Sequence, residues 1–351
     1  MHIDKFEDAI MNCRFCFMCR HLSAIGNVRF TEVDTPRIRA AMLYGLRTGT
    51  NSFDDEDFVE ALYRQDLSGC CVHHCVNHYD ENGLALAARA DVVEAGKAPE
   101  AVKKLAAKFV KSVGWKAESS SAKATEDKGV AWFLDETTAS DKAVVAATKK
   151  LFAAAKVTPK VITGGSIGKA LKVLGYLPEA KSAAEKFAAF LKAEGVKTLV
   201  VSSPAATNAL KQDYPEFGVK LPCEVKCVCG FALGAKVKFR KAAGEVYALA
   251  DDFRRNYEGC KCMEKTLAAL KAVNKPFGTN DEETYNCGEG AVVLDRLHPE
   301  LVKALAEYVA ARADDPKNDK IVVGSVYAKK ALVKYGKLNA VTLEELAAGC
   351  L

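Results

Sequence analysis

The chain has 351 residues, of which 49% are hydrophobic and 27% charged. That is an ordinary balance for a globular protein long enough for two or three domains. The formal net charge is only +5, from 50 basic and 45 acidic residues that are interspersed, which argues against a concentrated basic surface for nucleic acid. No apolar run approaches the roughly 18 residues that a membrane span needs.

The cysteine content points to metal chemistry. The first residues are partly acidic and lack an apolar stretch, so they do not resemble a signal peptide, and we expect a cytoplasmic protein. Thiols stay reduced in that compartment. The 13 cysteines of the chain therefore predict metal ligands rather than disulfides.

The first part of the chain predicts helices. Thr35 is a suitable N-cap with Pro36 at the first helical position, and this helix should stop at Gly49. The acidic residues 54–57 predict the first turn of a second helix, which should end near Gly69. An alanine-rich segment then predicts helical structure over 83–113. We expect residues 1–115 to form one helical domain.

Residues 116–128 are polar and serine-rich, and they predict a linker. Beyond it, short apolar runs alternate with helical segments, which predicts α/β layers with mainly parallel sheets. The runs that predict strands lie in 130–135, 160–165, 195–203, 243–249, 290–294 and 318–325. The segments that predict helices are 140–155, 178–194, 260–272, 298–312 and 326–335.

Two segments of the α/β part have the same form. Residues 197–215 and 319–336 each read as a charged residue, a buried strand, a turn of small residues and a helix. This echo predicts two related lobes, over 129–236 and 237–351. Because any two strand–turn–helix units share some similarity, the match by itself is loose.

Three cysteines near the N-terminus fall at an iron–sulfur spacing. Cys13, Cys16 and Cys19 follow the pattern C-x2-C-x2-C. Thiolates at this spacing can each bind a different iron of one cubane cluster, with backbone N–H groups bonded to the sulfurs. Zinc is the rival metal, but zinc sites usually use separated C-x2-C pairs.

The fourth ligand follows from the crossover found in two-cluster ferredoxins, where the last cysteine of each motif binds the other cluster. The fourth position of the first motif is Ser23. A second motif would end in Cys75, with Cys71, Ser68 and Gln65 at its earlier positions. One cluster would therefore keep all its ligands, and the other would keep only Cys71.

We thus predict one [4Fe–4S] cluster, whose four ligands are Cys13, Cys16, Cys19 and Cys75. An alternative is a site that combines Cys71 with one of the neighbouring histidines, which are His73, His74 and His78.

Residues 13–43 resemble the N-terminus of iron–sulfur oxidoreductase subunits with a cysteine-rich (CCG) domain. This family includes heterodisulfide reductase subunits and the iron–sulfur subunits of anaerobic glycerol-3-phosphate dehydrogenase and of glycolate or lactate oxidase. Residues 175–218 resemble its first CCG lobe, and residues 286–293 and 298–332 resemble the second. The resemblance implies an α-helical ferredoxin-like N-terminal domain followed by a two-lobed, duplicated α/β domain.

The chain departs from the family at the CCG motifs. Where the family has Cys-Cys-Gly and Cys-Pro-x-Cys, this chain has Ser166-Ile167-Gly168, Ser203-Pro204-Ala205-Ala206, Asn286-Cys287-Gly288 and Ser325-Val326-Tyr327-Ala328, and residues 248–251 replace His-Asp-Pro-Cys. Of the paired ligands only Cys287 remains. The family's noncubane cluster needs several of these thiolates together, so the resemblance implies that it is lost here.

The α/β part keeps cysteines at spacings that are not those of the family. They are Cys223, Cys227, Cys229, Cys260, Cys262 and Cys287. They could form a relocated second cluster, or they could be buried small apolar residues. The glycine-rich residues 164–169 lack the full phosphate-loop patterns, which favours a tight strand–helix turn over a weak anion site.

These features together predict an electron-transfer subunit without catalytic residues of its own. By family resemblance its partner would be a flavoprotein dehydrogenase or another iron–sulfur subunit in a hetero-oligomeric complex of anaerobic metabolism. Two alternatives stay open. One is a redox enzyme with a relocated cluster around Cys223–Cys287, and the other is a regulatory or scaffold paralogue with a structural cluster.

Overall fold

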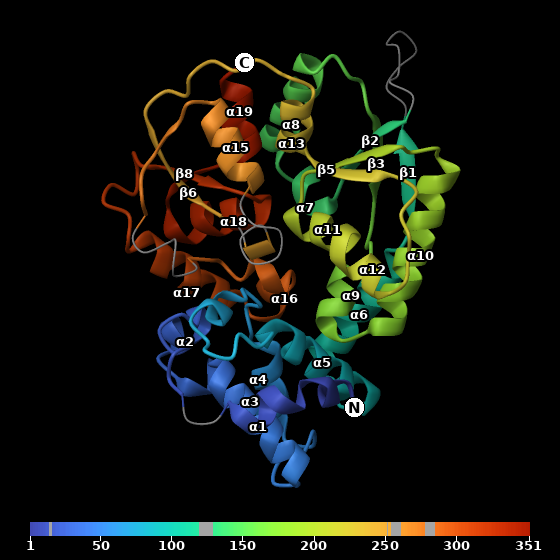
Figure 1. The fold of residues 1–351 in the computed structure, drawn as a ribbon, viewed down its shortest axis with the longest axis vertical. Coiled ribbons are helices and arrows are strands. Elements are labelled where there is room, and N and C mark those ends of the chain that lie inside the picture. The colour runs from blue at the N-terminus through green and yellow to red at the C-terminus, as the bar shows by residue number, and fades with distance from the viewer. Residues whose placement is uncertain (14–15, 119–128, 251, 254–260, 278–284) are drawn as a thin grey trace.

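The computed structural model describes residues 1–13, 16–118, 129–250, 252–253, 261–277 and 285–351. Helices make up the N-terminal part, and two α/β lobes, each with its own sheet, follow it along the chain. Figure 1 shows the helical part at one end of the molecule and the two sheets side by side at the other. The structure therefore has the predicted mixture of helices and parallel-rich sheets.

The N-terminal part contains short 3-10 turns and helices as follows: η1 His2–Phe6, α1 Glu7–Asn12, α2 Ala24–Arg29, η2 Glu32–Asp34, α3 Pro36–Thr48, α4 Glu56–Tyr63, η3 Cys70–His73, α5 Glu81–Glu94 and α6 Glu100–Lys111. Helix α3 has the predicted ends. The Thr35 hydroxyl accepts the amide of Ile38, and Gly49 closes the helix at φ 75°.

Two helix predictions differ from the structure in their bounds. Helix α4 starts at its N-cap Asp55 but ends at Tyr63, well before Gly69. The alanine-rich segment forms two helices, because Gly96 takes a positive φ of 72° after α5 and Pro99 precedes α6. Both breaks let the following chain fold back on the helices that precede it.

The first lobe contains β1 Trp115–Glu118, β2 Val130–Leu134, α7 Glu136–Ala139, α8 Lys142–Ala154, β3 Lys160–Gly164, α9 Lys169–Leu174, α10 Leu177–Ala193, β4 Thr198–Val201, α11 Pro204–Asn208, the π-helix η4 Ala209–Asp213, α12 Tyr214–Glu216, β5 Glu224–Cys227 and α13 Val228–Gly234. Its sheet has the order β1-β3-β2-β4-β5, parallel except for β1.

The second lobe contains β6 Glu245–Leu249, α15 Lys261–Ala269, β7 Val273–Asn274, η5 Glu289–Ala291, α16 Leu294–Leu297, α17 Pro299–Ala310, β8 Lys320–Val323, α18 Val326–Ala331, the π-helix η6 Leu332–Gly336, β9 Asn339–Thr342 and α19 Leu343–Gly349. Its sheet has the order β7-β6-β8-β9, and every pairing is parallel.

The parallel strands of the two sheets have the same order. With β1 left aside, the order across the first sheet is β3-β2-β4-β5 and the order across the second is β7-β6-β8-β9. In both, the strand that comes second along the chain lies at one edge, and the first, third and fourth strands follow it across the sheet. In both lobes the third strand leads into a short α-helix that continues as a π-helix. The two segments that resemble each other in sequence therefore have the same local structure.

Two sequence predictions are corrected here. Residues 116–118 of the predicted linker, together with Trp115 of the predicted helical domain, pair with β3 as an antiparallel edge strand. Residues 119–128 lie outside the described part. The apolar run 290–294 is not a strand. It forms the 3-10 turn η5 and the start of α16, because Gly288 takes a φ of 79° and Gly290 is packed directly against the carbonyl of Leu67.

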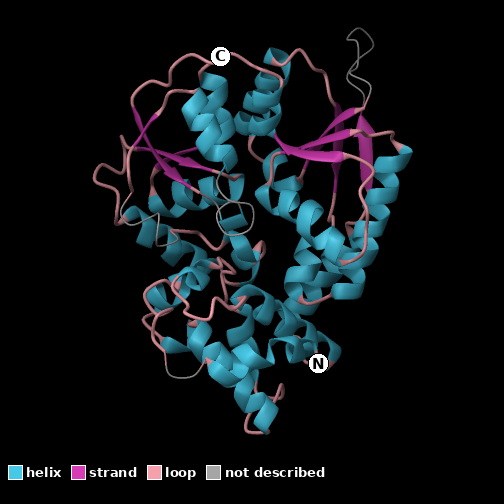
Figure 2. Cartoon of the chain, viewed as in Figure 1, coloured by secondary structure: helices cyan, strands magenta, loops and turns pink. Residues whose placement is uncertain are grey.

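The core joins the lobes as well as filling them. One hydrophobic cluster lies between the two sheets and contains Trp132 and Val200 from the first lobe with Val322 and Leu343 from the second. Helix α8 of the first lobe packs against α19 of the second, as the ribbon in Figure 2 shows between the sheets. A second cluster runs through the N-terminal helices into both lobes.

A buried arginine ties the N-terminal part to the first lobe. Arg89 on α5 is 1% exposed. Its Nε donates to the carbonyl of Leu62 at 2.8 Å, its Nη1 to that of Val173 at 3.0 Å and its Nη2 to that of Gln65 at 3.4 Å. Burial lowers the pKa of this guanidinium to about 10, which keeps it charged at neutral pH.

We expect Arg89→Met to lower the free energy of unfolding by about 3 kcal/mol or more, because the buried carbonyls that it serves lose their donor. The measurement is urea unfolding followed by circular dichroism. Arg47→Met is the control, since Arg47 forms only surface ion pairs with Asp4 and Glu7 and should cost less than about 1 kcal/mol. Equal midpoints for Arg89→Met and the wild type would contradict this account.

Candidate metal centre

The four predicted ligands line one cavity. Cys13, Cys16, Cys19 and Cys75 all border it, although Cys75 lies far along the chain from the other three. Cys71 also lines this cavity, which we call the cysteine cavity. The remaining lining residues are Asn12, Met18, Pro36, Val72, Val76, Asn77, Tyr79 and Glu81.

Local backbone geometry brings the cysteines to this cavity. Cys13 is the C-cap of α1, so the chain leaves the helix at this residue. The loop then turns so that the amide of Met18 donates to the Cys16 sulfur at 3.4 Å, an N–H···S contact of the kind that surrounds iron–sulfur clusters. Cys75 follows the 3-10 turn η3, and its amide donates to the Cys71 carbonyl at 3.1 Å.

The protein environment favours the protonated form of two of these thiols, Cys13 and Cys19. Burial raises the pKa of Cys13, against the hydrogen bond that it receives from Tyr79. Burial also raises the pKa of Cys19 to about 11. Metals bind thiolates, so a bound metal group has to displace these protons, and its affinity will depend on pH.

The spacing of the sulfurs bears on the kind of metal. Sulfurs bound to one tetrahedral zinc at about 2.3 Å lie within about 4 Å of one another. Within the described residues no three cysteine sulfurs lie within 4.8 Å of one another. A cubane holds its thiolates further apart because each binds a different iron. Among the described residues, the cysteines therefore form no group of three at the distances that a single ion requires.

Hydrogen bonds and packing occupy the positions that a second cubane would need. These positions, 23, 65, 68 and 71, are all buried. Ser23 caps α2 by accepting the Gly26 amide, and its hydroxyl donates to the carbonyl of Asp34. The Ser68 hydroxyl lies 3.2 Å from the Cys70 sulfur, which in turn donates to the carbonyl of Leu22 at 2.8 Å.

The described residues do not form the alternative metal site that would combine Cys71 with a neighbouring histidine. The Cys71 sulfur bonds to the Cys19 carbonyl at 3.5 Å. His74 lies 3.0 Å from the His21 ring, and His78 lies 3.0 Å from the Val72 carbonyl. The side chain of His73 lies outside the described part. Cys71 therefore supports the Cys19 loop, and no described histidine joins it in a metal-sized group.

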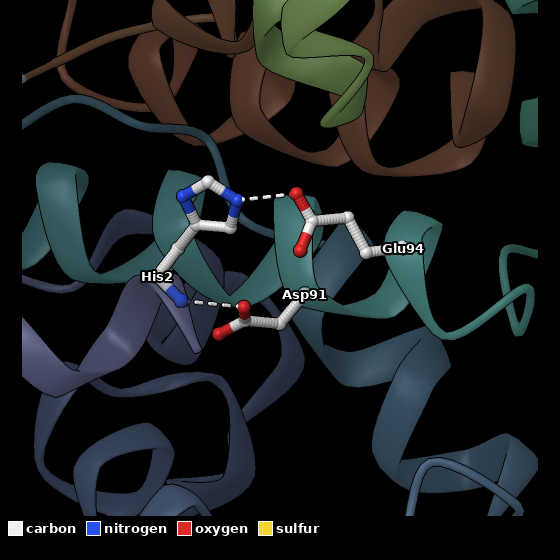
Figure 3. Close-up of side chains that lie close together, drawn as sticks. All are labelled: His2, Asp91 and Glu94. Atoms are coloured by element: carbon white, nitrogen blue, oxygen red, sulfur yellow. Dashed lines mark hydrogen bonds and ion pairs between the residues drawn. The ribbon is translucent and has the colours of Figure 1, made fainter.

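A different set of side chains meets at metal-ligand distance near the N-terminus, as Figure 3 shows for His2, Asp91 and Glu94. The Asp91 oxygens already accept the amides of His2 at 2.6 Å and Ile3 at 3.0 Å, and the His2 ring lies 2.7 Å from Glu94. These bonds fasten the first 3-10 turn to α5. We assign the group this structural role.

The described cysteines of the α/β part do not all meet at one place, but the sulfurs of Cys227 and Cys262 both lie beside Gly230. Cys223 packs on the cluster that covers the outer face of the first sheet, Cys229 and Cys262 belong to the cluster between the sheets, and Cys287 belongs to the N-terminal cluster. Cys260 lies outside the described part. The sulfur of Cys227 accepts the amide of Gly230 at 3.3 Å as a helix cap.

Three of the positions that the sequence analysis compared with CCG motifs serve as helix caps or interface residues. Ser203 and Ser325 cap α11 and α18, and they line one cavity between the lobes. Asn286 donates to the Asp66 carboxylate at 3.0 Å across to the N-terminal part. In the glycine-rich turn, the Lys169 ammonium donates to Asn208 and Asp213.

Sequence reasoning missed a buried carboxyl group beside the cysteines. Glu81 is the first residue of α5, lines the cysteine cavity and accepts the amide of Cys71 at 3.0 Å. Burial raises its pKa to about 7, partly offset by Arg39. An acidic residue after Asp80 is an ordinary helix-start signal, so nothing in the sequence distinguished it.

Comparison with known proteins adds no assignment. A scan of protein-family models found no match to the chain, and a search of curated proteins found no significant similarity. Within the described residues, the helices lack the length and apolar character that crossing a membrane requires.

We expect the stability of the metal-free protein to fall as pH rises through the pKa of Glu81. The folded state holds the proton up to about pH 7, whereas the unfolded chain loses it near 4.5, so folding weakens across this interval. Glu81→Gln should reduce that decline, as measured by urea unfolding at pH 5 and pH 8. Glu100→Gln on exposed α6 is the control, and an unchanged pH dependence in Glu81→Gln would refute the assignment.

Proposed function

We propose that this protein is an electron-transfer iron–sulfur subunit with one [4Fe–4S] cluster, bound by Cys13, Cys16, Cys19 and Cys75. The observation that carries the proposal is that these four thiols, and only one further cysteine among the described residues, line the cysteine cavity. The cluster, when bound, accepts and passes on one electron at a time.

The surrounding residues support this assignment by what they do for the cysteines. Met18 and Tyr79 donate hydrogen bonds to the sulfurs of Cys16 and Cys13. Such bonds stabilise negative charge on sulfur and set the reduction potential of a bound cluster. The half-buried position of Cys13, Cys19 and Cys75 leaves the site near the surface, as electron exchange with a partner requires.

The proposal includes the ferredoxin-like character of the helical part and the duplication of the lobes. Duplication is supported by the shared strand order and by the paired Ser203 and Ser325 turns, which lead into equivalent α-then-π helices. With the CCG cysteines replaced, the lobes would serve as a docking body without a noncubane cluster.

The proposed partner is a flavoprotein dehydrogenase or another iron–sulfur subunit, in the cytoplasm, where thiolate ligands stay reduced. Apolar side chains at the cysteine cavity suit such a contact. Phe17 is 63% exposed, Met18 45% and Val76 73%. Phe17 also lies over the Arg37 guanidinium, whose carbon is 4.5 Å from the ring centroid, so the surface combines apolar and positive groups.

A second candidate, a redox enzyme with a relocated cluster around Cys223–Cys287, is separated from the first by iron analysis. About four irons per chain support the relay, and about eight support a second cluster. A regulatory protein with a structural cluster would bind about four irons but exchange no electrons with a reduced partner. Identification of the proteins that co-purify under anaerobic conditions tests the relay directly.

We expect Cys75→Ser to lower bound iron as severely as Cys16→Ser, because each removes a thiolate from the same cluster. Cys71→Ser is the matched control from the same cavity and should retain most of the iron. The measurement is iron content with the visible absorption of the anaerobically purified protein. Loss of iron in Cys71→Ser with none in Cys75→Ser would overturn the crossover assignment.

We expect Phe17→Glu to slow reduction by the co-purifying protein partner several-fold while leaving the iron content unchanged, since a charge at an apolar contact disfavours docking. Reduction by dithionite, which needs no docking, should be unaffected. Val110→Glu, on exposed α6, is the control. If Phe17→Glu is reduced at the normal rate, the partner docks elsewhere.

A further inference from the structure

A cavity of about 390 Å³ opens between the two lobes. That volume lies within the range of about 300 to 1,000 Å³ found for sites of small ligands. The first lobe contributes residues at α7, and the second contributes residues around α16, α18 and η6. The lining residues are Glu136, Thr137, Ser140, Val292, Asp295, Arg296, Val302, Tyr327, Lys330, Ala331, Lys334 and Tyr335.

Two smaller cavities of about 140 and 60 Å³ adjoin this one. Thr137 and Val292 line all three cavities, and we call the three together the inter-lobe cleft. Its inner walls include Ser203 after β4 and Ser325 after β8. The cleft thus lies at the carboxyl ends of strands in both sheets.

The strand order strengthens the case for a ligand at this place. In open parallel sheets, ligands bind outside the carboxyl ends of strands where the order of connection reverses. In the first sheet that point lies between β2 and β4. The residues that follow these strands, 135–137 and 203–205, line the smaller cavities.

Three cations border the main cavity. The Arg296 guanidinium lies over the Phe109 ring, 5.1 Å from its centroid. Lys330 and Lys334 are four residues apart on continuous helix, and the Lys330 ammonium contacts the Ser140 hydroxyl across the cleft. Across the described ranges, none of the three has an ion-pair partner within 4 Å. They therefore remain available to an anionic group.

The other lining groups suit hydroxyl-bearing ligands. Glu136 and Asp295 offer carboxylates that accept hydrogen bonds from ligand hydroxyls. Thr137 offers a hydroxyl that can donate or accept, and the Ser203 hydroxyl can still donate while it accepts the Ala206 amide. A ligand with both an anionic end and hydroxyl groups would satisfy the two sets at once.

The backbone at the centre of the cleft is strained. Val292 has a φ of 61°, a conformation that is a genuine outlier for a β-branched residue. It is also one of the two residues common to all three cavities. Such strain persists where the surrounding structure imposes it, and it concentrates at functional sites.

We propose that the inter-lobe cleft binds a small hydroxylated organic anion, with its phosphate or carboxylate held by Arg296, Lys330 and Lys334 and its hydroxyls by Glu136 and the neighbouring hydroxyl side chains. The site shares no residue with the cysteine cavity and stands independently of the iron–sulfur proposal. Because the ligand would touch both lobes, its binding would hold them together.

The test is isothermal titration calorimetry of the full chain with D-ribose 5-phosphate, malate and D-ribose. We expect at least one anionic probe to bind with a Kd of about 1 mM or tighter, and uncharged ribose not to bind. Preference for ribose 5-phosphate would identify a phosphate ligand, and preference for malate a carboxylate ligand.

Lys330→Gln and Lys334→Gln should each raise the Kd of the bound anion about tenfold, since each removes a charge-assisted hydrogen bond. Both side chains are exposed, so these variants test the site even if Arg296→Gln, which loses its packing on Phe109, fails to fold. Lys186→Gln, on α10 away from the cleft, is the matched control and should bind normally. Absence of binding by both anions, equal binding of ribose, or an unchanged Kd in both lysine variants would overturn the proposal.

Discussion

The arrangement of the molecule depends on the buried backbone of residues 65–71, which joins the helical part to the second lobe and also holds Arg89, whose guanidinium reaches the first lobe. The carbonyl of Gln65 accepts from Arg89, and the carbonyl of Leu67 accepts the side-chain amide of Asn82. The Asp66 carboxylate accepts from Asn286 of the second lobe. Polar backbone buried without partners would cost several kcal/mol, so these contacts specify how the parts fit together.

The same segment also supports the cysteine cavity. Ser68, Cys70 and Cys71 direct their side chains into hydrogen bonds with one another or with the carbonyls of Leu22 and Cys19. These hydrogen bonds hold the backbone of the loop that carries Cys19. Cys71, which would bind iron in a two-cluster protein, here supports the loop that carries Cys19.

Hydroxyl groups hold the strand–helix turns of both lobes. Ser203 and Ser325 stand at helix starts, where a side-chain oxygen satisfies a backbone amide that would otherwise lack an acceptor. The same two side chains line the space between the lobes with small polar groups.

The sequence by itself determined features that depend on a few neighbouring residues. Thr35, Pro36 and Gly49 predicted the ends of α3, and the apolar runs predicted β2, β3, β4, β6 and β8 close to their observed bounds. The cysteine triple and the crossover rule selected the four thiols that line one cavity, although the cluster itself stays a proposal.

Only the tertiary structure decided the features that depend on distant segments. The run 290–294 has strand propensity, but close packing of Gly290 against Leu67 imposes a turn there. The burial of Glu81 and Arg89, and the meeting of Arg296, Lys330 and Ser140 at one cleft, follow from elements that are remote along the chain. Periodicity and capping signals act over a few neighbouring residues. The burial of a charged side chain, and the meeting of side chains from distant segments, depend instead on which surfaces pack together.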